Sequence, residues 1–129
     1  MTGLAPVPEK RRILVVDDSI ENADCLTQLL KLMGHIVHTV YSGVRAIEVV
    51  IEMKPEIVLL DIGMPEMNGY EVCIHLRKRV GDDLLIIAIT GLGHPADRIR
   101  SMEAGFDHHL VKPAAFDVLH ELLKKKAVA

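Results

Sequence analysis

The stretch IVLLDIGMPEMNG, residues 57–69, joins a run of four branched apolar residues to a single carboxylate and a turn-rich segment. An apolar run of this length, without polar alternation, is typical of a strand that is buried on both faces of a parallel sheet. Asp61 closes that run, and Gly63, Pro65 and Gly69 follow it in a segment rich in turn-forming residues. We therefore expect a buried strand to present Asp61 at its carboxyl end.

The rest of the chain repeats this alternation of short apolar runs and helical stripes. The apolar runs that read as strands lie at 13–16, 36–40, 57–60, 84–89 and 108–111. Apolar residues at helical spacing follow each run. Short strands that alternate with helices predict an α/β fold, with a parallel sheet covered by helices on both faces. Right-handed crossovers favour a flavodoxin-like (βα)5 three-layer sandwich with strand order 2-1-3-4-5.

The length and composition are those of one globular domain. We expect a flexible N-terminal lead at 1–11, a single domain at 12–126 and a C-terminal tail at 127–129. Half of the 129 residues are apolar, yet only two Phe, two Tyr and no Trp are present, so the core must be aliphatic. The scarcity of aromatic side chains argues against a base-stacking surface and therefore against direct nucleic-acid binding.

The charge pattern and the cysteines exclude further classes. The net charge is -3, and the basic run Lys124–Lys126 is typical of a solvated helix end. No apolar run reaches the roughly 18 to 20 residues that span a bilayer, and the N-terminus lacks the apolar middle of a signal peptide. We therefore expect a cytoplasmic protein without membrane insertion. Cys25 and Cys73 lack metal-ligand spacing and are predicted to be reduced, partly buried thiols.

Polar side chains stand where four of the predicted strands end. Asp17 and Asp18 follow the first strand, Asp61 the third, Thr90 the fourth and Lys112 the fifth. In open α/β sheets, ligands bind outside the carboxyl ends of the strands, at the point where the strand order reverses. The first and third strands flank that point in the predicted order. We therefore expect three carboxylates, a hydroxyl and an ammonium group to converge on one crevice.

This combination of groups favours phosphoryl chemistry. Taken singly, the two aspartates after the first strand are typical helix caps, Thr90 is an ordinary strand end and Lys112 is an ordinary exposed charge. Together, three neighbouring carboxylates repel one another and call for a cation, and Mg²⁺ prefers carboxylates, water and phosphate oxygens. A lysine and a hydroxyl can contact a phosphoryl group. The set is suited to placing a phosphoryl group on a carboxylate nucleophile.

Four motifs resemble those of the response-regulator receiver domain of two-component signalling. They are ILVVDDS at 13–19, IVLLDIGMPEMNG at 57–69, IAITG at 87–91 and AGFDHHLVKP at 104–113, so that the resemblance covers nearly the whole chain. It implies that Asp61 is the phosphoacceptor, which takes its phosphoryl group from a phosphohistidine of a histidine kinase or a histidine phosphotransfer protein.

The resemblance also implies a metal site. Asp18 would bind Mg²⁺ directly, Asp17 would act mainly through water, and Asp61 and the backbone carbonyl of Gly63 would complete the ligands, with Mn²⁺ as a possible substitute. The domain would catalyse only its own phosphorylation and a slow self-dephosphorylation, and would not be an enzyme in the usual sense.

Further roles follow from the same resemblance. Lys112 would contact the phosphoryl oxygens, the Thr90 hydroxyl would move toward them, and the peptide bond before Pro113 would be cis. His109 stands where the family usually carries Tyr or Phe as the partner of the switch Thr, and it is a smaller, titratable ring. Phosphorylation would switch a protein-interaction surface made of the fourth helix, the fifth strand and the fifth helix.

Two positions bear on how long the phosphoryl group lasts. Gly63 and Leu92 lie two residues after the phosphoacceptor and two after the switch Thr, positions that influence the hydrolytic water in this family. Neither side chain can hydrogen-bond a water molecule, so we predict slow self-dephosphorylation.

Other features stay open at this stage. The resemblance fits a stand-alone regulator or a receiver excised from a hybrid histidine kinase, either of them a monomer or a weak dimer with an unknown downstream protein target. Two other classes share the fold or the nucleophile. A flavodoxin-like FMN-binding module needs a phosphate-cradling loop after the first strand, where Asp17 and Asp18 would repel a phosphate. An aspartyl-phosphate phosphatase normally has a second Asp at the position of Gly63.

Overall fold

The computed structural model describes residues 10–91, 95–112 and 116–125. Within these ranges the strands are β1 (Arg12–Val16), β2 (Ile36–Val40), β3 (Ile57–Asp61), β4 (Leu85–Thr90) and β5 (His108–Val111). The helices that alternate with them are α1 (Ile20–Leu32), α2 (Gly43–Met53), α3 (Gly69–Val80), α4 (Pro95–Ala104) and α5 (Phe116–Lys125). All strand pairs are parallel, and the order β2-β1-β3-β4-β5 confirms the predicted fold.

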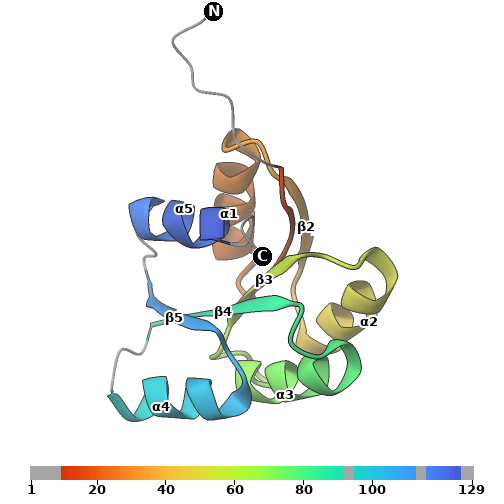
Figure 1. Cartoon of the computed structure of the whole chain (residues 1–129), viewed down its shortest axis with the longest axis vertical. Helices are drawn as coiled ribbons and strands as arrows, with labels where there is room; N and C mark the ends of the chain where they lie inside the picture. Colours follow the sequence, from red (N-terminus) through yellow and green to blue (C-terminus); the bar gives the residue numbers. More distant parts are fainter. Residues whose placement is uncertain (1–9, 92–94, 113–115, 126–129) are drawn as a thin grey trace, which may run out of the picture.

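The sheet is the middle of three layers. Helices α1 and α5 cover one face, and α2, α3 and α4 lie on the other (Figure 1). Alternate strand residues therefore belong to different halves of the core. Leu14, Val58 and Ile86 pack toward α2 and α3, whereas Ile13 and Ile57 pack toward α1 and α5. Both halves are dominated by aliphatic side chains, as the composition predicts.

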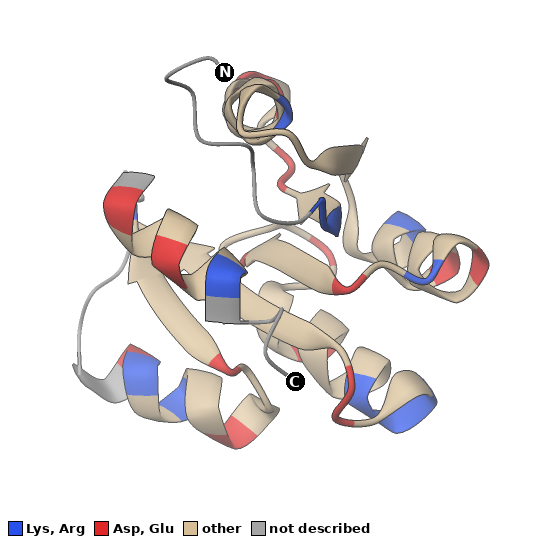
Figure 2. Cartoon of the chain, turned by 45° about the horizontal axis from the view of Figure 1, so that its top comes forward, with Lys and Arg blue, Asp and Glu red and all other residues tan. Residues whose placement is uncertain are grey.

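The strands carry almost no charge except where they end. The only Lys, Arg, Asp or Glu residues within the five described strands are Arg12 and Asp61, and the sheet is correspondingly tan in Figure 2. Asp61 lies within β3 rather than just after it, because it pairs in register with Ile89 of β4. In the same way β4 extends to Thr90, which pairs with Val111. Asp61 and Thr90 are thus part of the sheet itself.

Two local features differ from the sequence pattern. Arg11, which the pattern places in the flexible lead, is buried at 6% exposure, and its backbone N–H donates to Nδ1 of His35. Packing of the domain therefore begins at Arg11, while residues 1–9 and the tail at 127–129 lie outside the described residues. Cys73 is buried as predicted, but Cys25 is exposed because it lies on the outward face of α1.

Among the described residues, no helix combines the length and apolar composition needed to cross a bilayer.

The turn from β3 into α3 is tightly packed against the end of β3. Asn68 caps α3 in a reciprocal capping box with Glu71. The N–H of Gly69 donates to the carbonyl oxygen of Ile62 at 3.0 Å. A Cβ atom at Gly69 would lie 2.7 Å from the Asp61 carbonyl oxygen and 2.7 Å from Cα of Ile62, both of them backbone atoms. Only glycine therefore allows α3 to begin this close to Asp61.

Replacing this glycine should destabilise the domain. Alanine normally favours a helix over glycine by about 1 kcal/mol, yet the backbone clash should make Gly69→Ala unfavourable by roughly 1–3 kcal/mol. Gly63→Ala is the matched control, because a Cβ atom there meets nothing within 4 Å. Urea unfolding followed by circular dichroism measures both variants. A Gly69→Ala domain as stable as the wild type would show that α3 shifts freely away from β3.

Candidate functional site

Three carboxylates meet at the point where the strand order reverses. Asp17 and Asp18 directly follow β1, and Asp61 closes β3, the strand paired with β1. One carboxylate oxygen from each residue lies within 4.8 Å of the other two. Asp17 and Asp61 are buried, whereas Asp18 is exposed. The structure therefore brings together the three aspartates that the sequence pattern placed at separate strand ends.

The residue that caps α1 is Ser19, which leaves the preceding carboxylates available for other contacts. The Ser19 side chain accepts a hydrogen bond from the N–H of Asn22 at 3.3 Å. Asp17 instead accepts from the N–H of Ser19 through Oδ1 at 2.9 Å. This bond fixes the carboxylate and turns its second oxygen, Oδ2, toward Lys112. The ordinary explanation of the two aspartates as helix caps therefore does not apply.

Lys112 is the cation that holds the two buried carboxylates together. Its Nζ lies 3.2 Å from Oδ2 of Asp17 and 3.4 Å from Oδ1 of Asp61. Burial alone would lower the pKa of Lys112, but the neighbouring Asp61 and Asp17 carboxylates outweigh it and raise that pKa. The backbone N–H of Lys112 also donates to the carbonyl oxygen of Thr90 at 2.7 Å, which ties the residue to the end of β4. Lys112 is therefore a charged, fixed member of the site.

The Asp61 carboxyl remains short of positive charge. Burial raises its pKa, the nearby Asp17 carboxylate raises it further, and Lys112 and the Gly63 N–H offset only part of this effect. The pKa of Asp61 in the folded protein thus lies above its unfolded value. Ionisation of Asp61 therefore opposes folding as the pH rises through the folded pKa, and the corresponding stability is present in full only below the unfolded pKa.

A divalent cation fits this cluster of charges. Two buried carboxylates and an exposed one supply oxygen ligands, and one ammonium group does not neutralise all three. The Gly63 N–H donates to Oδ1 of Asp61 at 3.4 Å, so the Gly63 backbone lies beside the same carboxylate. The space where a Gly63 side chain would stand is open to 4 Å. The cluster can hold a metal ion through oxygen atoms alone.

The two predicted switch residues lie on neighbouring strands. Thr90 is buried at the end of β4. His109 is half-buried on β5 and pairs in register with Ala88, two positions before Thr90. Pro113, predicted to follow a cis peptide bond, and Leu92, predicted to affect hydrolysis, lie outside the described residues.

Sequence reasoning missed one contact of the switch region. Nδ1 of His109 lies 2.8 Å from Oγ of Ser101, a buried residue on α4. A serine inside a helical pattern gives no sequence signal for such a contact. Only the packing of α4 against β5 brings the two residues together.

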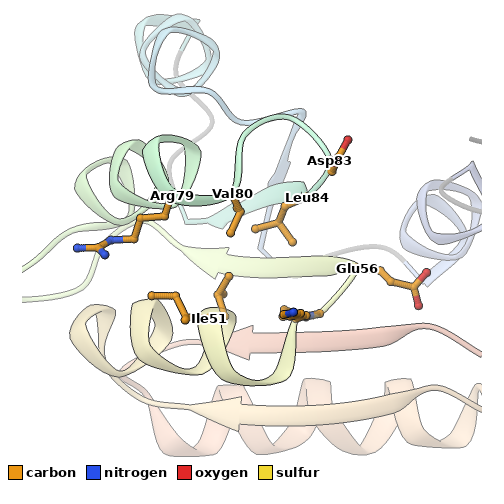
Figure 3. A pocket seen from close by; sticks show the side chains of 9 residues that line it. Ile51, Glu56, Arg79, Val80, Asp83 and Leu84 are labelled. Carbon is orange, nitrogen blue, oxygen red and sulfur yellow. The ribbon is translucent and has the colours of Figure 1, made fainter.

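A separate hollow lies near the opposite ends of the strands. It is formed between α2 and α3, and Ile51, Val80 and Leu84 face one another across it (Figure 3). Glu56 directly precedes β3 and Leu84 directly precedes β4, so the hollow opens beside the amino ends of these strands. It is therefore distinct from the carboxylate cluster, which stands at the carboxyl ends.

Comparison with known sequences identifies the family. The model of the response regulator receiver domain matches residues 13–124. The chain is 38% identical to the response regulator MprA of Mycobacterium ulcerans over 108 residues, which are 84% of this chain and 46% of that protein. It is 42% identical to ycf27 of Cyanophora paradoxa, named a probable transcriptional regulator, over 81% of this chain and 43% of that protein. The chain thus spans about half the length of the curated relatives it matches.

Solved structures agree with the sequence relatives. The BeF3-activated N-terminal receiver domain of RstA from Klebsiella pneumoniae is 30% identical, with a TM-score of 0.83 over 89% of this chain and 97% of that one. A CheY-like receiver domain protein from Methanospirillum hungatei is 26% identical, also with a TM-score of 0.83, over 92% of this chain and 95% of that one. These matches leave the flavin-binding and phosphatase alternatives without support, and the chain belongs to the family of response regulator receiver domains.

Proposed function

We propose that Asp61 is the phosphoacceptor of this receiver domain and that its donor is a phosphohistidine of a histidine kinase or a histidine phosphotransfer protein. The observation that supports this assignment is the position of Asp61. Its carboxylate closes a fully buried strand, contacts the Lys112 ammonium and stands beside the Asp17 and Asp18 carboxylates. A rigid strand end is a suitable mount for a nucleophile, because it fixes the reacting oxygen relative to its partners.

In the proposed transfer, an Asp61 carboxylate oxygen attacks the phosphorus atom in line with the phosphorus–nitrogen bond of the donor. The new P–O bond forms as the P–N bond breaks, and the electron pair of the P–N bond returns to the imidazole nitrogen. A donor ring protonated on its other nitrogen then leaves as neutral imidazole. Lys112 offsets charge on the phosphoryl oxygens as a point charge, and the Thr90 hydroxyl donates to one of them.

The metal of this proposal is Mg²⁺, for which Mn²⁺ can substitute. Asp18 would hold it directly and Asp17 mainly through water, with Asp61 and the Gly63 carbonyl as further ligands. When bound, the ion keeps Asp61 ionised and neutralises charge on the phosphoryl oxygens. Burial and the Asp17 carboxylate raise the pKa of Asp61, and a bound cation would oppose that effect.

The proposed output surface is formed by α4, β5 and α5. Ile99, Met102 and Val118 are exposed on its two helices at 60%, 74% and 46%, respectively. Exposed apolar residues of this kind suit a protein partner. In this proposal the chain signals through that partner in the cytoplasm, as a monomer or weak dimer, and acts on no separate substrate. His109 serves as the switch residue beneath the surface.

Phosphoryl labelling tests the assignment of Asp61. With acetyl phosphate and Mg²⁺, intact-protein mass spectrometry should show the gain of one phosphoryl group in the wild type, and Asp61→Asn should lose that gain completely. Chelation of the metal with EDTA should also prevent labelling, because the carboxylates then repel one another and the phosphoryl oxygens. Asp82→Asn is the control, since Asp82 is an exposed carboxylate in the turn before β4. Labelling that survives in Asp61→Asn would refute the assignment.

The lifetime of the phosphoryl group tests the roles of Gly63 and Leu92. Side chains that bind a hydrolytic water should speed its attack, so Gly63→Asn combined with Leu92→Glu should accelerate phosphoryl loss about three- to tenfold, or roughly 1 kcal/mol in the barrier. Decay of the labelled protein is followed by mass spectrometry after removal of the donor. The control Gly63→Ala adds carbon without a polar atom and should decay like the wild type. Equal decay of the double variant and the wild type would contradict the proposed roles.

A further inference from the structure

Three chain segments are hydrogen-bonded to one another at the amino ends of the strands, opposite the carboxylate cluster. Arg11 directly precedes β1, His35 lies between α1 and β2, and Glu56 directly precedes β3. The N–H of Ile36 donates to the carbonyl oxygen of Arg11 at 2.9 Å, and the N–H of Glu56 donates to that of Arg12, also at 2.9 Å. Packing at this end of the sheet therefore depends on how Arg11 is held.

The imidazole ring of His35 supplies one of the contacts that hold Arg11. The backbone N–H of Arg11 donates to Nδ1 of His35 at 3.0 Å. Because a backbone N–H can only donate, Nδ1 carries no proton, and the one N–H of the neutral ring is on Nε2. A second proton on this ring must bind Nδ1, where the Arg11 N–H stands. The imidazolium form of His35 therefore cannot keep the bond.

The burial of Arg11 makes this bond costly to lose. Arg11 is 6% exposed, so water does not readily replace a lost partner of its backbone N–H. Its guanidinium is held by Glu56, because Nη1 of Arg11 donates to Oε2 of Glu56 at 3.3 Å. The Glu56 side chain points away from the hollow between α2 and α3 (Figure 3). A fixed positive charge therefore acts on the His35 ring.

The surroundings of His35 oppose a second proton on its ring. Burial does most to lower the pKa of His35, the Arg11 guanidinium and His120 of α5 lower it further, and Glu56 raises it in part. The pKa of His35 in the folded protein thus lies below the ordinary value of about 6.5. The stability that neutral His35 contributes is present in full above that ordinary value, and it is lost as the pH falls through the folded pKa.

We propose that His35 is a proton-sensitive clasp that holds Arg11 to the turn between α1 and β2, and that a proton on Nδ1 of His35 opens it. In the open form, an imidazolium stands beside the Arg11 guanidinium, and the Arg11 N–H has lost its ring acceptor. Opening loosens the amino end of β1 in acid. The clasp does not depend on the proposed role of Asp61, because β1 separates Arg11 from the carboxylate cluster.

NMR of the wild-type protein tests the bond directly. Long-range ¹H–¹⁵N spectra at pH 7.5 should show the Nε2–H tautomer for His35. Between pH 7.5 and 4.5, the protection factor of the Arg11 amide against hydrogen exchange should fall about tenfold, the effect of one lost buried hydrogen bond. This fall should follow the titration of the His35 ring. An Nδ1–H tautomer at pH 7.5, or protection of Arg11 that stays constant while His35 takes up its proton, would overturn the clasp.

The variant His35→Asn separates the clasp from other effects of acid, because its amide oxygen can accept a hydrogen bond but does not titrate. In urea unfolding, the unfolding equilibrium constant of the wild type should rise about five- to tenfold more than that of His35→Asn between pH 7.5 and 4.5. His75→Asn replaces an exposed histidine of α3 and should keep the wild-type pH dependence. Equal pH dependence of the wild type and His35→Asn would contradict the clasp. If His35→Asn does not fold, the exchange measurement on the wild type decides.

Discussion

The crowding of two buried carboxylates beside one ammonium group is the constraint on which the rest of the site depends. Asp17 follows β1 and Asp61 ends β3, and these strands are paired in fixed register. This pairing holds the backbones of the two residues close together, and Lys112 neutralises only part of the charge of their carboxylates. Burial of Asp61, together with this imbalance, raises its pKa and makes the site receptive to a cation.

The contact between the carboxylates and Lys112 also connects the site to β5. Lys112 follows β5 directly, so the residue that balances the carboxylates belongs to the segment that carries His109. A change of charge at Asp61 therefore acts on β5 through its immediate neighbour. A hydrogen bond between Ser101 and His109 joins β5 to α4.

The fold and most of the site could be predicted because they depend on periodicity and strand order. Branched apolar runs identify buried strands, and parallel register then brings their carboxyl ends together, so Asp17, Asp61 and Lys112 converge as expected. Contacts set by packing between elements have no such signal. The Ser101–His109 bond depends on how α4 lies against β5, and the burial of Arg11 depends on its contacts with Glu56 and His35 rather than on local sequence.

The effect of a divalent cation on the raised pKa of Asp61 can be measured by titration. ¹³C NMR of the Asp61 side-chain carboxyl carbon, followed against pH with and without Mg²⁺, should show a pKa above the ordinary carboxyl value in the metal-free protein and a marked decrease when Mg²⁺ is added. A pKa that stays the same when Mg²⁺ is added would show that the ion does not bind at Asp61.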